Sequence, residues 1–129
     1  MSDIHPIHSD KAPKAVGPYS QAMLHGGMLY ASGQIGLDPA SGKLVGDTVE
    51  AQAKQVTRNL SAVLAEAGAA TERILKVNIF LTDMADFPLV NGIYAEWLGE
   101  HRPARATVAV AELPLGAKVE MDLIASLAG

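Results

Sequence analysis

Residues 103–127 read PARATVAVAELPLGAKVEMDLIASL, and this stretch decides how the sheet of the protein is completed. Pro103 favours an extended start, and side chains alternate over 104–111 and 118–127 as they do in strands. If the turn at 113–116 closes a hairpin that pairs Ala109 with Glu120, then Arg105, Thr107 and Glu120 point to the same face. The opposite face, against the helices, is expected to hold the apolar set Ala106, Val108, Val110, Val119, Met121 and Leu123.

Two amphipathic helices are expected ahead of this stretch. Asp47 and Glu50 resemble a capping box, and apolar residues then recur at steps of three and four until Gly68, which predicts a helix over 47–67. The apolar spacing from Phe87 to Trp97, with proline in the first turn, predicts a second helix over 86–100.

Strands alternate with these helices. Residues 20–25 and 28–32 flank Gly26-Gly27, which favours a tight hairpin, and 75–81 has the alternation of a central strand. Residues 38–43 are rich in turn formers and predict a loop. The order predicts an α+β fold with two helices on one face of a mixed six-stranded sheet. We place Phe80, Ala109 and Ala111 on the uncovered face, which suggests that another copy of the chain covers it.

Composition limits the functions open to the protein. Its 129 residues are 49% hydrophobic, which fits one domain over 1–129, and cysteine is absent. The net charge of -4 argues against nucleic acid as a partner, because a phosphate backbone needs clustered lysine and arginine. The sequence has no stretch apolar enough to span a membrane and no signal peptide, so a cytoplasmic location is expected.

The usual catalytic motifs are missing from the sequence. It contains no Walker loop, G-x-G-x-x-G, G-x-S-x-G or H-E-x-x-H motif. His5 and His8 have no further ligands nearby, so no metal site is expected.

Arg105 is the most informative charged residue. Alanines flank it in an otherwise uncharged strand, and a partly desolvated guanidinium needs an anionic partner. The spacing of Arg105 and Glu120 along the two predicted strands slightly favours a structural ion pair between them. The alternative is a clamp for a substrate carboxylate, which leaves Glu120 free to activate water. Tyr19, Ser32 and Asn91 would be unremarkable by themselves.

Several stretches, in order and at matching spacing, resemble the Rid family of reactive intermediate deaminases, also called the YjgF family. They run nearly end to end along the chain. They are Ala15-Val16-Gly17-Pro18-Tyr19-Ser20-Gln21, Ala31-Ser32-Gly33-Gln34-Ile35-Gly36, Phe87 to Tyr94 around Asn91, and Pro103-Ala104-Arg105 with Val108, Val110, Leu113-Pro114 and Val119-Glu120.

The resemblance implies a chorismate-mutase-like subunit that forms a homotrimer with ligand clefts between subunits. It implies a role in metabolite damage control, in which reactive enamines and imines such as 2-aminoacrylate are hydrolysed to 2-keto acids and ammonia without metal or cofactor. By position, Arg105 would bind the substrate carboxylate and Glu120 would position water. Tyr19, Ser32 and Asn91 would line the cleft, as would Thr107, which stands where many members have cysteine and leaves the substrate range open.

Two other readings remain. Some members of the Rid family deaminate another substrate, 2-aminomuconate. The sequence does not decide between this substrate and imines such as 2-aminoacrylate. Other relatives have been described as translation inhibitors with ribonuclease activity, or as chaperones. The acidic charge balance argues against tight RNA binding but leaves a chaperone role open.

Overall fold

The computed structural model describes residues 3–127, whose strands form a single mixed sheet. The strands are β1 (His5–Ile7), β2 (Ala22–His25), β3 (Met28–Ile35), β4 (Ile74–Leu81), β5 (Ala104–Ala109) and β6 (Val119–Ser126). Their order across the sheet is β1-β2-β3-β6-β4-β5, in which β4 and β5 are parallel and all other neighbours are antiparallel. The predicted fold class and the six-stranded mixed sheet are confirmed.

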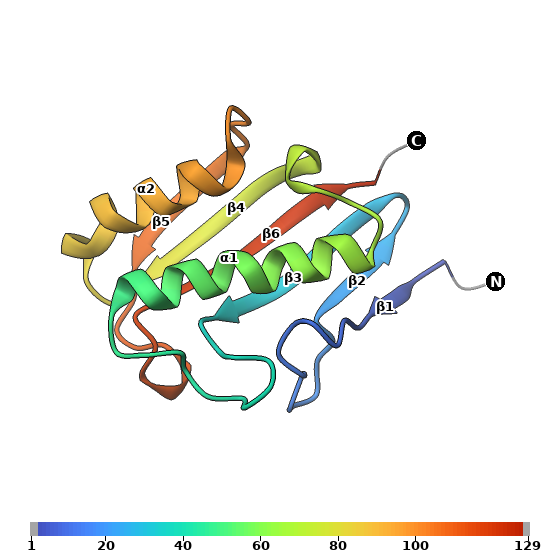
Figure 1. The fold of residues 1–129 in the computed structure, drawn as a ribbon. Helices are drawn as coiled ribbons and strands as arrows, with labels where there is room; N and C mark the ends of the chain where they lie inside the picture. The colour runs from blue at the N-terminus through green and yellow to red at the C-terminus, as the bar shows by residue number, and fades with distance from the viewer. Residues whose placement is uncertain (1–2, 128–129) are drawn as a thin grey trace.

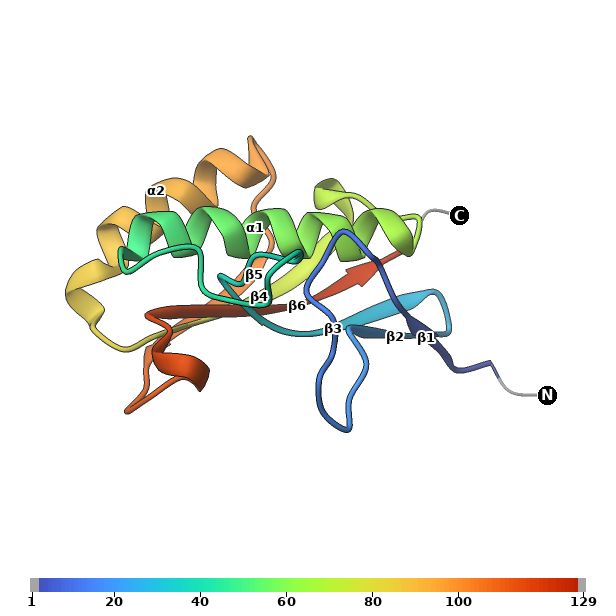
Figure 2. The same cartoon turned by 60° about the horizontal axis from the view of Figure 1, so that its bottom comes forward.

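Both helices lie on one face of this sheet (Figures 1 and 2). Helix α1 (Val49–Glu66) begins at Thr48, whose Oγ1 accepts a hydrogen bond from the Ala51 amide at 3.1 Å. The predicted capping box at Asp47 is therefore wrong by one position. Helix α2 (Phe87–Leu98) follows a 3-10 turn at Met84–Asp86 and carries its proline in the first turn, as predicted.

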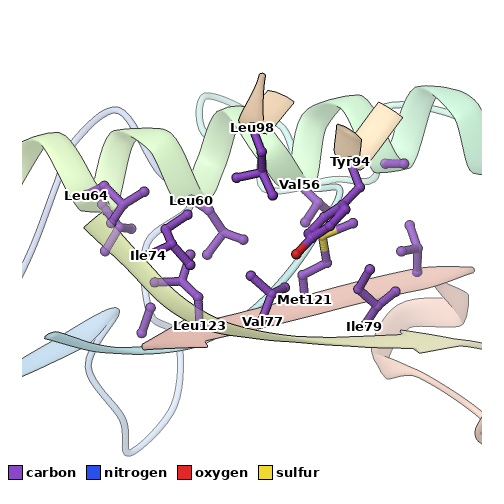
Figure 3. Packing of buried hydrophobic residues seen from close by; sticks show 14 of the residues in the cluster. Val56, Leu60, Leu64, Ile74, Val77, Ile79, Tyr94, Leu98, Met121 and Leu123 are labelled. Carbon is purple, nitrogen blue, oxygen red and sulfur yellow. The ribbon is translucent and has the colours of Figure 1, made fainter. Parts of the chain in front are cut away.

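The core fills the space between the helices and the sheet. Tyr94 reaches from α2 into this layer, beside Met121 of β6 and the alternate residues Val77 and Ile79 of β4 (Figure 3). Burial of Val77, Ile79 and Leu81 identifies the helix side of β4, so their neighbours Asn78 and Phe80 mark the helix-free side.

The hairpin at Gly26-Gly27 is confirmed: both residues have positive φ, at 59° and 77°. A second feature of β3 matters more for function. The pairing of β3 with β6 shifts register between Ala31 and Gln34, which makes a bulge at Ser32-Gly33. On the helix-free side, the loops that precede β2 and β6 project away from the sheet (Figure 2).

Candidate functional site

Arg105 lies on the edge strand β5, on the helix side of the sheet. It is aligned with the buried Val77 of β4, so its side chain extends beneath α2. Its Nη1 donates a hydrogen bond of 2.6 Å to Asn91 Oδ1. The guanidinium carbon lies 5.2 Å from the ring centroids of both Phe87 and Tyr94, within the range of cation–π attraction.

These three partners form a cradle for Arg105, which we call the α2 cradle: Phe87, Asn91 and Tyr94. Their spacing of four and three residues brings them to one face of the helix. None of the ion pairs within residues 3–127 includes Arg105. The side chain is exposed, so most of its N–H donors remain available to an anion from outside the chain.

A cavity of about 510 Å³ opens over this guanidinium, and we call it the Arg105 cavity. It is lined by Asn91, Tyr94, Ala95, Arg102, Pro103 and Arg105. The hydroxyl oxygens of Tyr94 and of Thr107, two residues beyond Arg105, are buried and have no hydrogen-bond partner in the described part of the chain. Burial raises the pKa of Tyr94 despite the opposing positive charges of Arg105 and Arg102.

Glu120 lies on the other side of the sheet. It is aligned with Phe80 of β4, and its neighbours Val119 and Met121 are fully buried in the core, so its half-buried side chain points to the helix-free face. Burial raises the pKa of Glu120, and the nearby carboxylate of Asp122 raises it further. A carboxylate with a raised pKa is a better proton acceptor at neutral pH.

The bulge in β3 provides the space for this carboxylate. A Cβ added to Gly33 would overlap the Glu120 side chain, so glycine leaves room for the carboxylate in the position that it occupies. Ser32 holds the bulge in place, because its amide donates to Gln21 O at 2.9 Å and its hydroxyl donates to Ser20 O at 2.6 Å. The Ser32 hydroxyl thus donates to the main chain and steadies the bulge beside Glu120.

A second cavity, of about 570 Å³, contains Glu120, and we call it the Glu120 cavity. Tyr19 and Gly33 line it together with the exposed apolar residues Val16 and Leu115. Leu115 has a φ of 59°, in the left-handed region that disfavours a leucine. The loops that carry Tyr19 and Leu115 project from the helix-free side of the sheet (Figure 2).

Comparison with known proteins identifies the family. The family model described as Endoribonuclease L-PSP matches residues 9–127. Protein DfrA of Myxococcus xanthus is 52% identical over 121 residues, which cover 92% of each chain. The human 2-iminobutanoate/2-iminopropanoate deaminase is 44% identical over 119 residues, 92% of this chain and 87% of that protein. A crystal structure of a Rid-family protein from Yersinia pestis superimposes with a TM-score of 0.94, at 45% identity, over 96% of this chain and 99% of its own.

The chain belongs to the YjgF/Rid family. The resemblance drawn from the sequence is therefore confirmed. In the described part of this Rid chain no group of three histidine, aspartate or glutamate residues is arranged to hold a metal ion. Within residues 3–127 no helix is long and apolar enough to cross a membrane.

The expected hairpin between the last two strands is wrong in this Rid protein. Strand β4 lies between β5 and β6, because the β4-α2-β5 crossover places β5 parallel to β4 at the edge of the sheet. The connection after β5 then passes β4 to reach β6 on its other side. The short loop at 113–116 suggested direct pairing, but strand order is a tertiary property that the loop sequence does not determine.

This error reverses the faces assigned to β5. Arg105, Thr107 and Ala109 align with the buried residues of β4 and lie on the helix side, whereas Ala106 and Val108 lie on the helix-free side. Val108 is accordingly 45% exposed. Ala109 is therefore not part of the helix-free surface, since it aligns with Leu81, and Ala111 lies outside the sheet, in the loop before β6. Phe80 does lie on the helix-free face, as predicted.

The predicted site residues accordingly divide into two groups. Arg105 and Asn91 line the Arg105 cavity, and Thr107 lies on the same side of the sheet. Glu120 and Tyr19 line the Glu120 cavity, with Ser32 next to its lining residue Gly33. The structural ion pair between Arg105 and Glu120 is absent from the described residues, because the two side chains point to opposite faces.

Sequence reasoning missed Phe87 of the α2 cradle and, among the residues that line the two cavities, Tyr94, Gly33 and Arg102. Phe87 and Tyr94 belong to the apolar spacing that predicts the second helix, and their positions around Asn91 could have revealed the cradle. Gly33 and Arg102 carried no signal of their own, because a bulge and a turn are not visible in residue periodicity.

Proposed function

We propose that this Rid protein is a deaminase that hydrolyses 2-imino and 2-enamine carboxylates, such as 2-aminoacrylate and 2-iminobutanoate, to 2-keto acids and ammonia. The proposal rests on the partners of the Arg105 guanidinium. Its guanidinium is held by the α2 cradle and has no carboxylate partner within residues 3–127. Such an arginine is suited to grip a substrate carboxylate with two parallel hydrogen bonds.

Glu120 has the properties of the base in this reaction. A water molecule beside its carboxylate attacks C2 of the protonated imine, Glu120 takes the proton that the water loses, and a neutral carbinolamine forms. Glu120 then returns this proton to the nitrogen of the carbinolamine. The C–N bond breaks, ammonia leaves, and the carbinolamine hydroxyl gives its proton to the Glu120 carboxylate as the C2 carbonyl forms. The raised pKa of Glu120 favours these transfers, because the carboxylate is a stronger base and its protonated form persists closer to neutral pH.

A single chain does not present Arg105 and Glu120 to the same small ligand, because they lie on opposite faces of the sheet. We propose that each cleft is completed by a second copy, with the Arg105 cavity of one subunit facing the Glu120 cavity of the next in a homotrimer. The sheet supports this proposal, because helices cover only one of its faces and Tyr30 and Val108 are 46% and 45% exposed.

The test of activity is a panel of imines generated in situ from several amino acids, with 2-aminomuconate included, assayed with chelator and without added cofactor. We expect loss of the imine to be faster than in buffer and to yield the 2-keto acid. A rate equal to the buffer rate across the panel would reject the deaminase. Single-stranded RNA and an aggregation-prone client assayed in parallel would then separate a ribonuclease from a chaperone.

The test of the shared cleft is complementation between two inactive variants. When Arg105→Ala and Glu120→Gln subunits are mixed equally and reassembled, a cleft is intact only if each neighbour supplies the correct side. Each of the two subunits at a cleft supplies its unaltered residue with a probability of one half. Both do so in about one quarter of the clefts, so about one quarter of the wild-type activity should return. Light scattering should give a mass of three times 13.5 kDa. No recovery in a mixed trimer, or a mass near 13.5 kDa, would overturn the shared cleft.

A further inference from the structure

Two arginines, not one, line the Arg105 cavity. Arg102 lies in the turn between α2 and β5, three residues before Arg105, and both contribute to the lining. No acidic residue contributes to that lining, and no ion pair within residues 3–127 includes either arginine. Two positive charges therefore share one cavity without an internal counter-ion, in a chain whose net charge is -4.

The main chain holds Arg102 in place. Its Nη1 donates to the carbonyl oxygens of Gly99 at 2.6 Å and of His101 at 2.9 Å. Gly99 has a positive φ of 64°, which ends α2 and turns the chain toward Arg102. These bonds use only one of the three guanidinium nitrogens. Nε–H and Nη2 remain available, on a side chain that has already lost much of its conformational freedom.

The two charges also act on a common neighbour. Arg105 and Arg102 both oppose the rise that burial causes in the pKa of Tyr94. Tyr94 is 5% exposed and lines the cavity beside both arginines. The guanidinium of Arg105 lies 5.2 Å from the centroid of this ring.

We propose that Arg102 is a second carboxylate-binding residue, so that the preferred substrates are 2-imino dicarboxylates of the size of 2-iminoglutarate. The inference rests on the proposed function, in which Arg105 binds the carboxylate next to the imine carbon. Arg102 then binds the carboxylate at the far end of the substrate side chain. A monocarboxylate would neutralise one guanidinium and leave the other without an anion, whereas a dicarboxylate satisfies both. A cavity of about 510 Å³ has room for a ligand of this size.

Binding of stable 2-keto acid products tests this assignment on the intact protein. By isothermal titration calorimetry we expect 2-oxoglutarate to bind about tenfold tighter than 2-oxobutanoate. Arg102→Gln should abolish this preference and leave the Kd of 2-oxobutanoate within twofold of wild type. Arg102→Lys, which keeps the charge and loses the planar fork, should retain part of the preference. Arg58→Gln is the matched control, because it removes the same charge from an exposed position on α1 and should change neither Kd.

Kinetics provide the second readout. Arg102→Gln should lower kcat/KM for 2-iminoglutarate about tenfold relative to kcat/KM for 2-iminobutanoate. Equal Kd values for the two keto acids in the wild type, or a preference that survives Arg102→Gln, would overturn the role of Arg102 and leave the proposed function standing. Failure of the proposed function looks different: 2-oxobutanoate would not bind, or Arg105→Ala would leave its Kd unchanged. A wild-type protein that binds neither keto acid would reject both the role of Arg102 and the proposed function.

Discussion

The Arg105 cavity and the Glu120 cavity hold opposite charges by opposite means. Arg105 is an exposed side chain on an edge strand, and the side chains of the α2 cradle hold it. Glu120 is a half-buried side chain on an inner strand, and a glycine bulge of the main chain makes room for it. Exposure leaves the arginine hydrated until an anion arrives, whereas partial burial has already raised the pKa of the glutamate.

This difference explains why the two charges do not neutralise each other. Opposite faces of one sheet prevent the internal ion pair that their spacing in the sequence suggested. Both groups therefore remain available for a ligand in the shared cleft that we propose. The Glu120 cavity also lowers the stability of the folded protein more than the Arg105 cavity does, because it combines a half-buried charge with Leu115 in a left-handed conformation.

The largest expected effect separates chemistry from binding. Glu120→Gln keeps the shape of the side chain but removes the proton acceptor, so kcat should fall about 10²- to 10⁴-fold with little change in KM. Steady-state kinetics on an imine made in situ measure both values. Glu66→Gln is the control, because it makes the same change at an exposed position on α1 and should keep the wild-type kcat. A Glu120→Gln variant with more than a tenth of the wild-type kcat would remove Glu120 from the chemical step.

The next effect tests the binding side. Arg105→Lys should behave almost like Arg105→Ala, because lysine keeps the charge but loses the planar fork that grips a carboxylate. Both should lose at least about tenfold in kcat/KM while the proposed trimer persists. Circular dichroism and light scattering provide the controls for folding and assembly. Wild-type turnover in a well-folded Arg105→Ala protein would reject the carboxylate clamp.

A smaller effect tests how the bulge positions the base. A methyl group in Gly33→Ala would overlap the Glu120 carboxylate, which is the free end of a flexible side chain and can rotate away. The fold should therefore persist while kcat falls about tenfold through misplacement of the base. Gly46→Ala is the matched control, because its new Cβ meets only ordinary van der Waals contact with Ala51. Wild-type kcat in Gly33→Ala would mean that Glu120 acts without the bulge.

Local patterns predicted the elements but not the faces of the last two strands. The periodicity of residues 47–67 and 86–100 and the Gly26-Gly27 turn are local signals, and the structure contains both helices and the hairpin they indicate. The strand order is not local, since β4 separates β5 from β6 although β5 and β6 are consecutive in sequence. That one difference moved Arg105 and Thr107 to the face opposite Glu120. The residue types of the site could be predicted, but their division between two cavities could not.

The smallest expected effect is a dependence of stability on pH that comes from Glu120 alone. The pKa of Glu120 in the folded state is raised above its ordinary value of 4.5, so the folded protein holds this proton more tightly than the unfolded chain does. The stability gained from the protonated group is fully present below the unfolded pKa and is lost as the pH rises through the folded pKa. At pH 7 the partly buried charge therefore destabilises the protein.

Glu120→Gln removes this charge without a large change in shape. Its Tm should exceed that of the wild type at pH 7, and the difference should close as the pH falls below 4.5, where Glu120 is protonated in both states. The gain should be modest, because the side chain is only half-buried and solvent screens it. Calorimetry at pH 7 and pH 4 measures the two differences, with Arg105→Gln as the comparison for loss of an exposed charge. A lower Tm for Glu120→Gln at pH 7 would mean that the carboxylate stabilises the folded protein, and the Glu120 cavity would then not be the costlier of the two.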